Sequence, residues 1–138
     1  MGDRVVALAR DWIGTPYVHQ ASARGAGCDC LGLIRGVWRG LYGADPEPAP
    51  DYSPDWGECS GDEVLLRAMT RHFPRVDDGP HRPGQVLLFR MQAGAIAKHL
   101  GIVVPGNRFI HAYSGHGVID SPLTLPWRNR VVARFRFP

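Results

Sequence analysis

The chain has 138 residues, of which 44% are hydrophobic and 21% are charged, and its formal net charge is +3. This length predicts one domain, spanning residues 1–138, that buries a core without a disulfide or metal staple. The composition excludes collagen-like, disordered and disulfide-scaffold proteins. The positive charges form no basic cluster, so we expect mild attraction to anionic polymers and no nucleic-acid binding.

Neither a membrane span nor an export signal is expected. No stretch approaches the roughly 18 uninterrupted apolar residues of a transmembrane helix, so we expect no membrane insertion. The apolar run 5–9 is too short for a secretory signal, which predicts synthesis in the cytoplasm without a signal peptide. Cys28 and Cys30 are separated by one residue and the three cysteines are an odd number, which predicts at least one free thiol rather than a disulfide framework.

The first third of the chain predicts two helices around an irregular segment. Apolar residues at helical spacing predict a helix over residues 3–13. Residues 15–27 are rich in Gly, Ala and Ser and predict a surface loop. Asp29 is a good N-cap for a second helix, which carries Cys30 in its first turn and ends at Gly43.

The remaining chain predicts one more helix and then strands. Residues 44–58 are Pro-rich and predict a loop, after which Ser60 and Glu63 form an S-x-x-E capping box for a helix reaching about His72. Short β-rich runs follow at 85–90, 99–104, 108–112, 118–120 and 131–137. Helices first and strands afterwards, with connections too short for helical crossovers, predict an α+β domain with an antiparallel sheet.

Cys30 is the first candidate for chemistry. A cysteine is a nucleophile only as a thiolate, and a helix N-terminus with a nearby imidazolium lowers the pKa of a thiol. We therefore expect Cys30 to be the essential thiol and the most readily alkylated cysteine at mildly acidic pH. Taken alone, the pattern fits better with a small buried hydrophobe on an apolar helix face.

His99 and His111 are the second candidates, because strand alternation places them on one face of the sheet. A three-residue turn over 105–107 pairs Val104 with Arg108, and in that register Gly101 lies opposite His111 with His99 as its diagonal neighbour. Two histidines on one face suit a general base and its orienting partner. Exposed strand histidines are an equally good reading of the spacing alone.

Five short motifs occur in order along the chain: Thr15-Pro16-Tyr17, Asp29-Cys30-Leu31-Gly32-Leu33, Pro83-Gly84, His99-Leu100-Gly101-Ile102-Val103 and Phe109-Ile110-His111-Ala112. Together they resemble the NlpC/P60 cysteine peptidases over residues 1 to about 120. The Pro-rich stretch 46–56 and the residues around Cys30 resemble the phage tail branch most, including the cell wall peptidases of gene transfer agents. The resemblance implies a papain-like α+β fold, with N-terminal helices packed on an antiparallel sheet of about five strands.

The resemblance also implies an activity and its residues. The activity is cofactor-free hydrolysis of peptidoglycan stem peptides, typically between D-γ-glutamate and a diamino acid. Matched by motif, Cys30 is the nucleophile, His99 the general base and His111 the polar residue that orients it. The substrate or oxyanion side is assigned to three more residues: Tyr17, Asp29 and His19.

Three departures from the family pattern concern the surroundings of this triad. Residues 18–21 replace the usual aromatic residue and two glycines. Leu31 stands where a small serine commonly follows the nucleophile, and Gln85 stands where an acid is common. These departures affect the substrate side and leave the triad complete.

Two alternatives remain to be weighed against a peptidase. A zinc site built from Cys28, Cys30 and Cys59 fits poorly, since structural zinc sites usually present C-x2-4-C pairs, and we expect no metal. The other is a structural tail-tip or baseplate component that keeps the fold but has little activity.

The family resemblance implies partners as well as a substrate. A wall hydrolase without an export signal needs a carrier, and the resemblance supplies a phage-like tail with its baseplate hub proteins. Candidate surfaces are the aromatic loop 52–56 and the segment 126–138, whose alternating pattern is that of a half-buried edge strand. That strand either pairs with a partner or completes the chain's own sheet. Trp127 is a candidate for a groove wall or a partner surface.

Overall fold

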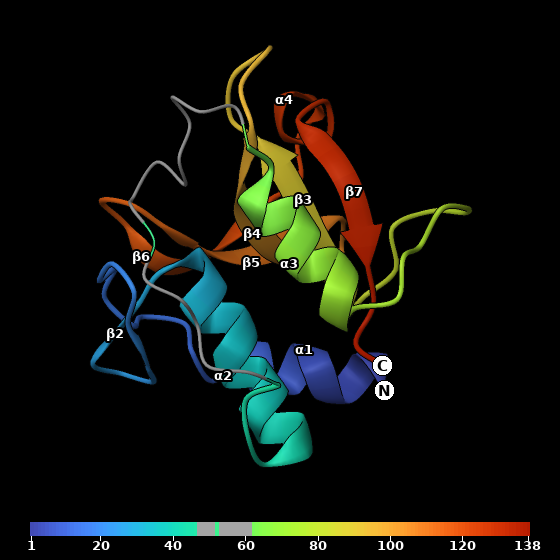
Figure 1. The fold of residues 1–138 in the computed structure, drawn as a ribbon. Helices are drawn as coiled ribbons and strands as arrows, with labels where there is room; N and C mark the ends of the chain where they lie inside the picture. Colours follow the sequence, from blue (N-terminus) through green and yellow to red (C-terminus); the bar gives the residue numbers. More distant parts are fainter. Residues whose placement is uncertain (47–51, 53–61) are drawn as a thin grey trace.

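The computed structural model describes residues 1–46, 52 and 62–138. Its elements are α1 (Gly2–Arg10), β1 (Ser22–Ala23), β2 (Gly27–Cys28), α2 (Cys30–Tyr42), α3 (Val64–His72), β3 (Val86–Arg90), β4 (Ala97–Val104), β5 (Arg108–Tyr113), β6 (Gly117–Pro122), α4 (Leu125–Arg128) and β7 (Val131–Phe135). Figure 1 shows α1 and α2 below the sheet and α4 beside the β3–β4 hairpin. None of the helices in the described ranges is long and apolar enough to cross a membrane.

The predicted α+β architecture is confirmed. Five strands form one antiparallel sheet in the order β6-β5-β4-β3-β7, and β1 with β2 forms a small separate hairpin. Alternate residues divide the sheet into two faces. Leu88, Leu100 and Ile102 face the core formed with α1, α2 and α3. Phe89 and Phe109 face the other way, where Trp127 of α4 packs against them.

Two predicted helix starts and ends are wrong in detail. The first helix ends at Arg10 rather than Ile13, because the next backbone N–H groups turn back on carbonyls three residues earlier and Gly14 has a φ of 92°. Glu63 is the N-cap of α3 rather than the third helical residue of a capping box. Its carboxylate instead accepts the Ala97 backbone N–H at 2.8 Å and contacts Arg90 at 3.4 Å. Ser60 lies outside the described residues.

The C-terminal strand completes the chain's own sheet. β7 pairs with β3 and forms one edge of the sheet. Its outer side already exchanges hydrogen bonds with residues 74–76, since Val76 donates to Arg134 and Arg136 donates to Pro74. Much of the edge that a partner strand would use is therefore occupied. Of the other predicted docking surface, residues 52–56, only Tyr52 is among the described residues.

Candidate active site

Cys30 is the first residue of α2, as the capping pattern predicts. The Asp29 carboxylate accepts the backbone N–H of Gly32 at 2.8 Å and so fixes the start of the helix. Gly32 leaves room for this turn, because a Cβ there would lie 1.9 Å from the Ala21 carbonyl oxygen. The Cys30 side chain is held at the helix N-terminus with only 4% of its surface exposed.

The thiol lies where two strands of the sheet separate. The pairing of β4 with β5 ends at Ile102 opposite Ile110, and beyond that point β5 continues with β6 as its partner. In the space that follows, the thiol donates to the Lys98 carbonyl, with Sγ and O 3.7 Å apart. The backbone N–H of Leu100 also points at the sulfur. The sulfur thus takes the place that the next residue of β5 would have in the pairing with β4. It lies against the backbone on both sides of His99.

His99, His111 and Ser121 form a line of hydrogen bonds. His99 Nε2 and His111 Nδ1 are 2.8 Å apart, and His111 Nε2 lies 2.9 Å from Ser121 Oγ. The predicted pairing of Val104 with Arg108 is confirmed, and it produces this shared face. His99 is 7% exposed and His111 0%, so the reading as exposed strand histidines is wrong.

The hydrogen-bond line defines a consistent set of tautomers. If His111 donates from Nε2 to Ser121, its Nδ1 has no proton and accepts from His99 Nε2. His99 then carries its proton on Nε2 and leaves Nδ1 free as a base. This is the form of His99 that can accept a proton from a thiol.

Burial keeps both the Cys30 thiol and the His99 imidazole neutral at rest. Burial, followed by the nearby Asp29 carboxylate, raises the pKa of Cys30 to about 12. Burial and the neighbouring His111 lower the pKa of His99 to about 3, and burial with His116 lowers the pKa of His111 to about 4. The expectation of a thiol with a lowered pKa is therefore wrong for this state, because burial outweighs the backbone N–H groups that favour the thiolate.

Aromatic rings close the site on the face opposite the large core. The Trp127 ring centroid lies 5.7 Å from that of His99 and 5.2 Å from that of His111. Tyr113 stacks on His111 at 5.3 Å. These rings help to bury the two histidines, and Trp127 itself is partly buried against Phe89 and Phe109. Its role as a groove wall or partner surface stays a prediction.

Ser121 is the member of the site that the sequence reasoning missed. The signal was present in the β5–β6 hairpin, where Phe109 pairs with Ser121 and His111 pairs with Ile119. Residues 109 and 111 share a face, so residue 121 shares it too. The strand parity that identified His111 would have found this hydroxyl if it had been extended by one strand.

The three predicted substrate-side residues gather around the start of α2. Asp29 is 2% exposed, and one carboxylate oxygen accepts both the Gln20 backbone N–H at 2.8 Å and the hydroxyl of Tyr52. His19 Nε2 lies 2.8 Å from the Tyr52 carbonyl oxygen. The backbone of Tyr17 forms an isolated parallel β-bridge with that of Cys28. Burial and the adjacent Cys30 raise the pKa of the Tyr17 hydroxyl. Asp29 thus organises this wall, with both of its oxygens engaged by the protein.

The described part of the chain contains no group of three His, Cys, Asp or Glu side chains that could hold a metal ion. Cys59, one member of the zinc alternative, lies outside the described residues. Cys28 is fully buried beneath the site, and burial raises its pKa to about 12.

A helix-start cysteine beside an orienting pair of histidines is the arrangement that nucleophilic cysteine catalysis uses. Residues 14–136 match the model of the NlpC/P60 family, so the chain belongs to this family. The NlpC/p60 domain of the peptidoglycan hydrolase SagA has the same fold, with a TM-score of 0.63 at 22% identity, and the match covers 99% of each chain.

Two curated relatives extend the comparison. The murein DD-endopeptidase MepS/murein LD-carboxypeptidase of Escherichia coli K12 is 27% identical over 128 residues, covering 92% of this chain and 58% of MepS. The tail tip assembly protein K of Escherichia phage N15 is 26% identical over 109 residues, covering 79% of this chain and 44% of that protein. The chain therefore spans little more than half the length of the first relative and less than half of the second.

Proposed function

We propose that this chain is a cysteine peptidase that hydrolyses peptidoglycan stem peptides. The observation that carries the proposal is a helix-start thiol held against the backbone on both sides of His99, whose ring begins the buried line to His111 and Ser121. Membership of the NlpC/P60 family and the similarity to MepS and SagA support the substrate class.

The mechanism begins from a neutral thiol and a neutral imidazole. As Cys30 Sγ bonds to the substrate carbonyl carbon, its proton passes to His99 Nδ1, and the carbonyl oxygen gains the negative charge. His111 accepts the Nε2 proton of His99 in a hydrogen bond and so stabilises the imidazolium. The leaving amine then takes the proton from His99, and a water molecule activated by His99 hydrolyses the thioester.

The bond we propose is the one between D-γ-glutamate and the diamino acid. The test incubates purified muropeptides of known sequence with the protein and identifies the fragments by mass. This assay separates γ-glutamyl cleavage from the DD- and LD-cleavage named for MepS. Cys30→Ala and His99→Ala should abolish product. An unchanged rate with Cys30→Ala, or no fragment from any muropeptide, would refute the peptidase proposal.

We also infer delivery by a phage-like tail, to whose hub or baseplate proteins the chain would bind. The similarity to tail tip assembly protein K supports this inference. A structural tail component with little activity is the alternative, but a purely structural protein has no need for a buried, hydrogen-bonded pair of histidines near a helix-start thiol. Mass spectrometry of purified particles tests delivery, and particles that lack the protein would contradict it.

A further inference from the structure

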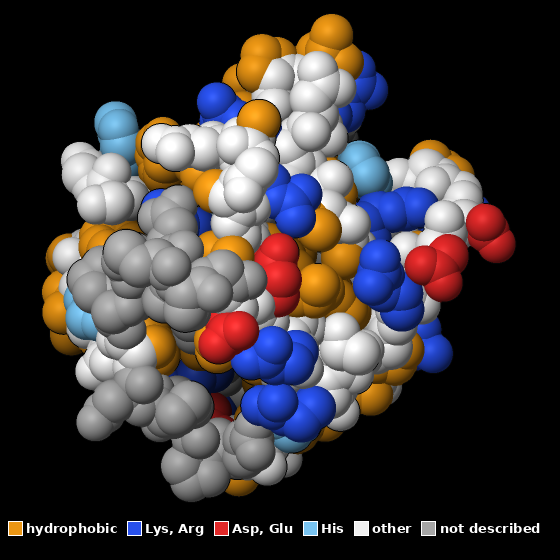
Figure 2. Space-filling view, turned by 45° about the horizontal axis from the view of Figure 1, so that its top comes forward, with side chains coloured by type: hydrophobic (Ala, Val, Ile, Leu, Met, Phe, Trp, Pro, Cys, Tyr) orange, Lys and Arg blue, Asp and Glu red, His pale blue; other side chains and the backbone are white. Residues whose placement is uncertain are grey.

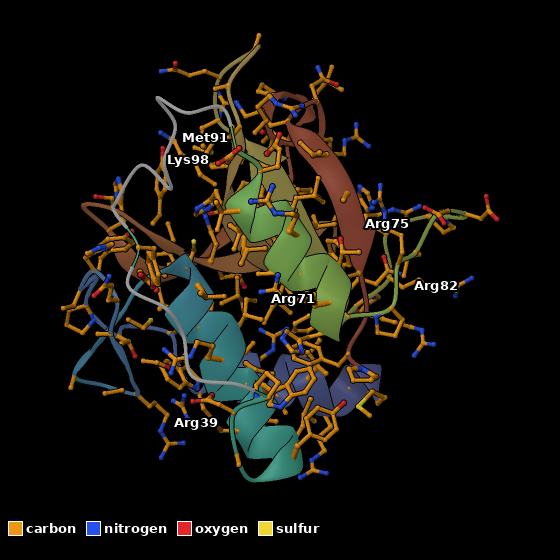
Figure 3. All side chains as sticks on the ribbon, viewed as in Figure 1. Arg39, Arg71, Arg75, Arg82, Met91 and Lys98 are labelled. Carbon is orange, nitrogen blue, oxygen red and sulfur yellow. The ribbon has the colours of Figure 1, made fainter. Side chains whose placement is uncertain are left out.

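A groove of about 500 Å³ lies between the β3–β4 hairpin and the turn that joins α4 to β7. Its lining contains two arginines and an asparagine but no acidic residue: Arg90, Met91, Ala93, Gly94, Asn129, Arg130 and Val131. In Figure 3 the label of Met91 marks the end of the hairpin that carries this groove. In Figure 2, Lys and Arg side chains form scattered patches among uncharged and hydrophobic surface, with a few acidic side chains beside them.

The two arginines differ in how much of their charge is already matched. Arg90 contacts the Glu63 carboxylate at 3.4 Å and donates to the Ala95 carbonyl, so its guanidinium is held in place and partly neutralised. Arg130 lies over the Trp127 ring, 5.3 Å from its centroid, and forms no salt bridge in the described part of the chain. The groove therefore has an excess positive charge, carried by a guanidinium that lies over an aromatic ring.

One lining residue of the groove, Val131, lies on the same face of the sheet as the two histidines. Phe89 on β3 pairs with His99 on one side and with Val131 on the other, and Val131 lines the groove. Two strand spacings separate the His99 strand from β7, which is about 10 Å. An extended peptide covers that distance with about three residues. The Trp127 ring contacts the His99 ring, and the Arg130 guanidinium lies over the Trp127 ring. Trp127 therefore connects the histidines with the groove.

We propose that this groove binds a carboxylate of the peptide substrate, with Arg130 as the main contact. The inference rests on the proposed function, because stem peptides carry carboxylates within three residues of the cleaved bond. A guanidinium pairs with a carboxylate through two parallel hydrogen bonds, which gives the site orientation as well as affinity. Arg130 would then select acidic stem peptides over those in which the same carboxylate is an amide.

The test compares a synthetic stem peptide with analogues in which one carboxylate at a time is a primary amide. For wild-type protein, we expect one of these amides to raise KM by about tenfold, the loss typical of one charge-assisted contact. Arg130→Gln should raise KM to the same extent for the acid and should leave that amide unaffected. Arg128→Gln is the matched control, because Arg128 lies two residues earlier, at the end of α4, and has the same charge but does not line the groove.

Two results would overturn the inference. One is an equal loss for acid and amide with Arg130→Gln, especially in kcat, since this would mean that Arg130 acts only by supporting Trp127. The other is an unchanged KM for the acid. Titration calorimetry of the same peptides with Cys30→Ala keeps this test separate from the proposed function. A Kd that depends on both Arg130 and the carboxylate supports the groove even if the wild-type protein cleaves nothing, whereas a Kd independent of either refutes it.

Discussion

Replacing Ser121 by alanine should impair His99, the proposed general base, although Ser121 contacts only His111. In the folded protein the Ser121 hydroxyl oxygen lies 2.9 Å from His111 Nε2, where it can accept the ring N–H, and His111 is fully buried. Without the hydroxyl, His111 keeps a favourable partner only on its Nδ1 side. It can then place its proton on Nδ1 and point it at His99 Nε2. His99 would respond by moving its own proton to Nδ1, where it can no longer accept the thiol proton.

The size of the effect follows from the hydrogen bond that is lost. A buried N–H left without an acceptor costs roughly 1 to 3 kcal/mol. The His99 tautomer with its proton on Nε2, which can accept the thiol proton, is then less favoured by this amount relative to the Nδ1 tautomer. With about 1.4 kcal/mol for each factor of ten, kcat should fall by about tenfold or more, while KM changes little because Ser121 lies behind the histidines. Ser121→Thr keeps the hydroxyl and should recover most of the rate.

Nitrogen NMR of the imidazole rings measures the tautomer directly and does not depend on finding the natural substrate. We expect wild-type His99 to be protonated on Nε2 and the Ser121→Ala protein to show a mixture. Ser114→Ala, at an exposed serine of the neighbouring turn, is the control. A single unchanged His99 tautomer with full kcat in Ser121→Ala, or a Thr variant no better than Ala, would show that Ser121 does not orient the pair.

Three other outcomes are expected. His99→Ala should lower kcat more than His111→Ala, because a base without its orienting partner still samples the productive geometry, and the reverse order in matched kinetics would exchange their roles. Iodoacetamide should label Cys30 slowly near neutral pH and faster as the pH rises toward its pKa of about 12, ahead of the fully buried Cys28. Peptide mapping by mass spectrometry checks this, and a labelling rate already constant below pH 8 would contradict it. Since the folded pKa values of His99 and His111 lie below the ordinary 6.5, the unfolded chain binds more protons at acidic pH, so stability should be full above pH 6.5 and fall as the pH drops toward about 3. Urea unfolding across this range measures it, and a pH-independent midpoint would argue against two buried neutral imidazoles.

Strand alternation and turn length were sufficient to predict the face shared by His99 and His111. Both are local properties, because a three-residue turn fixes the register before the strands reach the site. The helix start at Cys30 was predictable for the same reason, since Asp29 caps it with its own side chain. The face on which Ser121 lies follows from the same strand alternation, extended from β5 to β6.

Features that depend on distant segments could not be predicted. Glu63 fits a capping box in sequence, but the Ala97 N–H, 34 residues away, takes its carboxylate. The pKa of Cys30 depends on how completely helix and sheet enclose the sulfur, which no helix-start pattern reveals. The anchoring of Tyr52 to Asp29 likewise joins segments 23 residues apart.

The neutral thiol has a consequence for how long the protein survives. Peroxides and other oxidants attack thiolates, and oxidation beyond the sulfenic acid is in general irreversible. A sulfur that is enclosed by backbone and keeps its proton offers oxidants a poor target while the site is empty. In the proposed mechanism the thiolate forms only during the reaction, when a substrate carbonyl is present to receive the charge. The same enclosure that makes the resting cysteine slow to react therefore preserves it between turnovers.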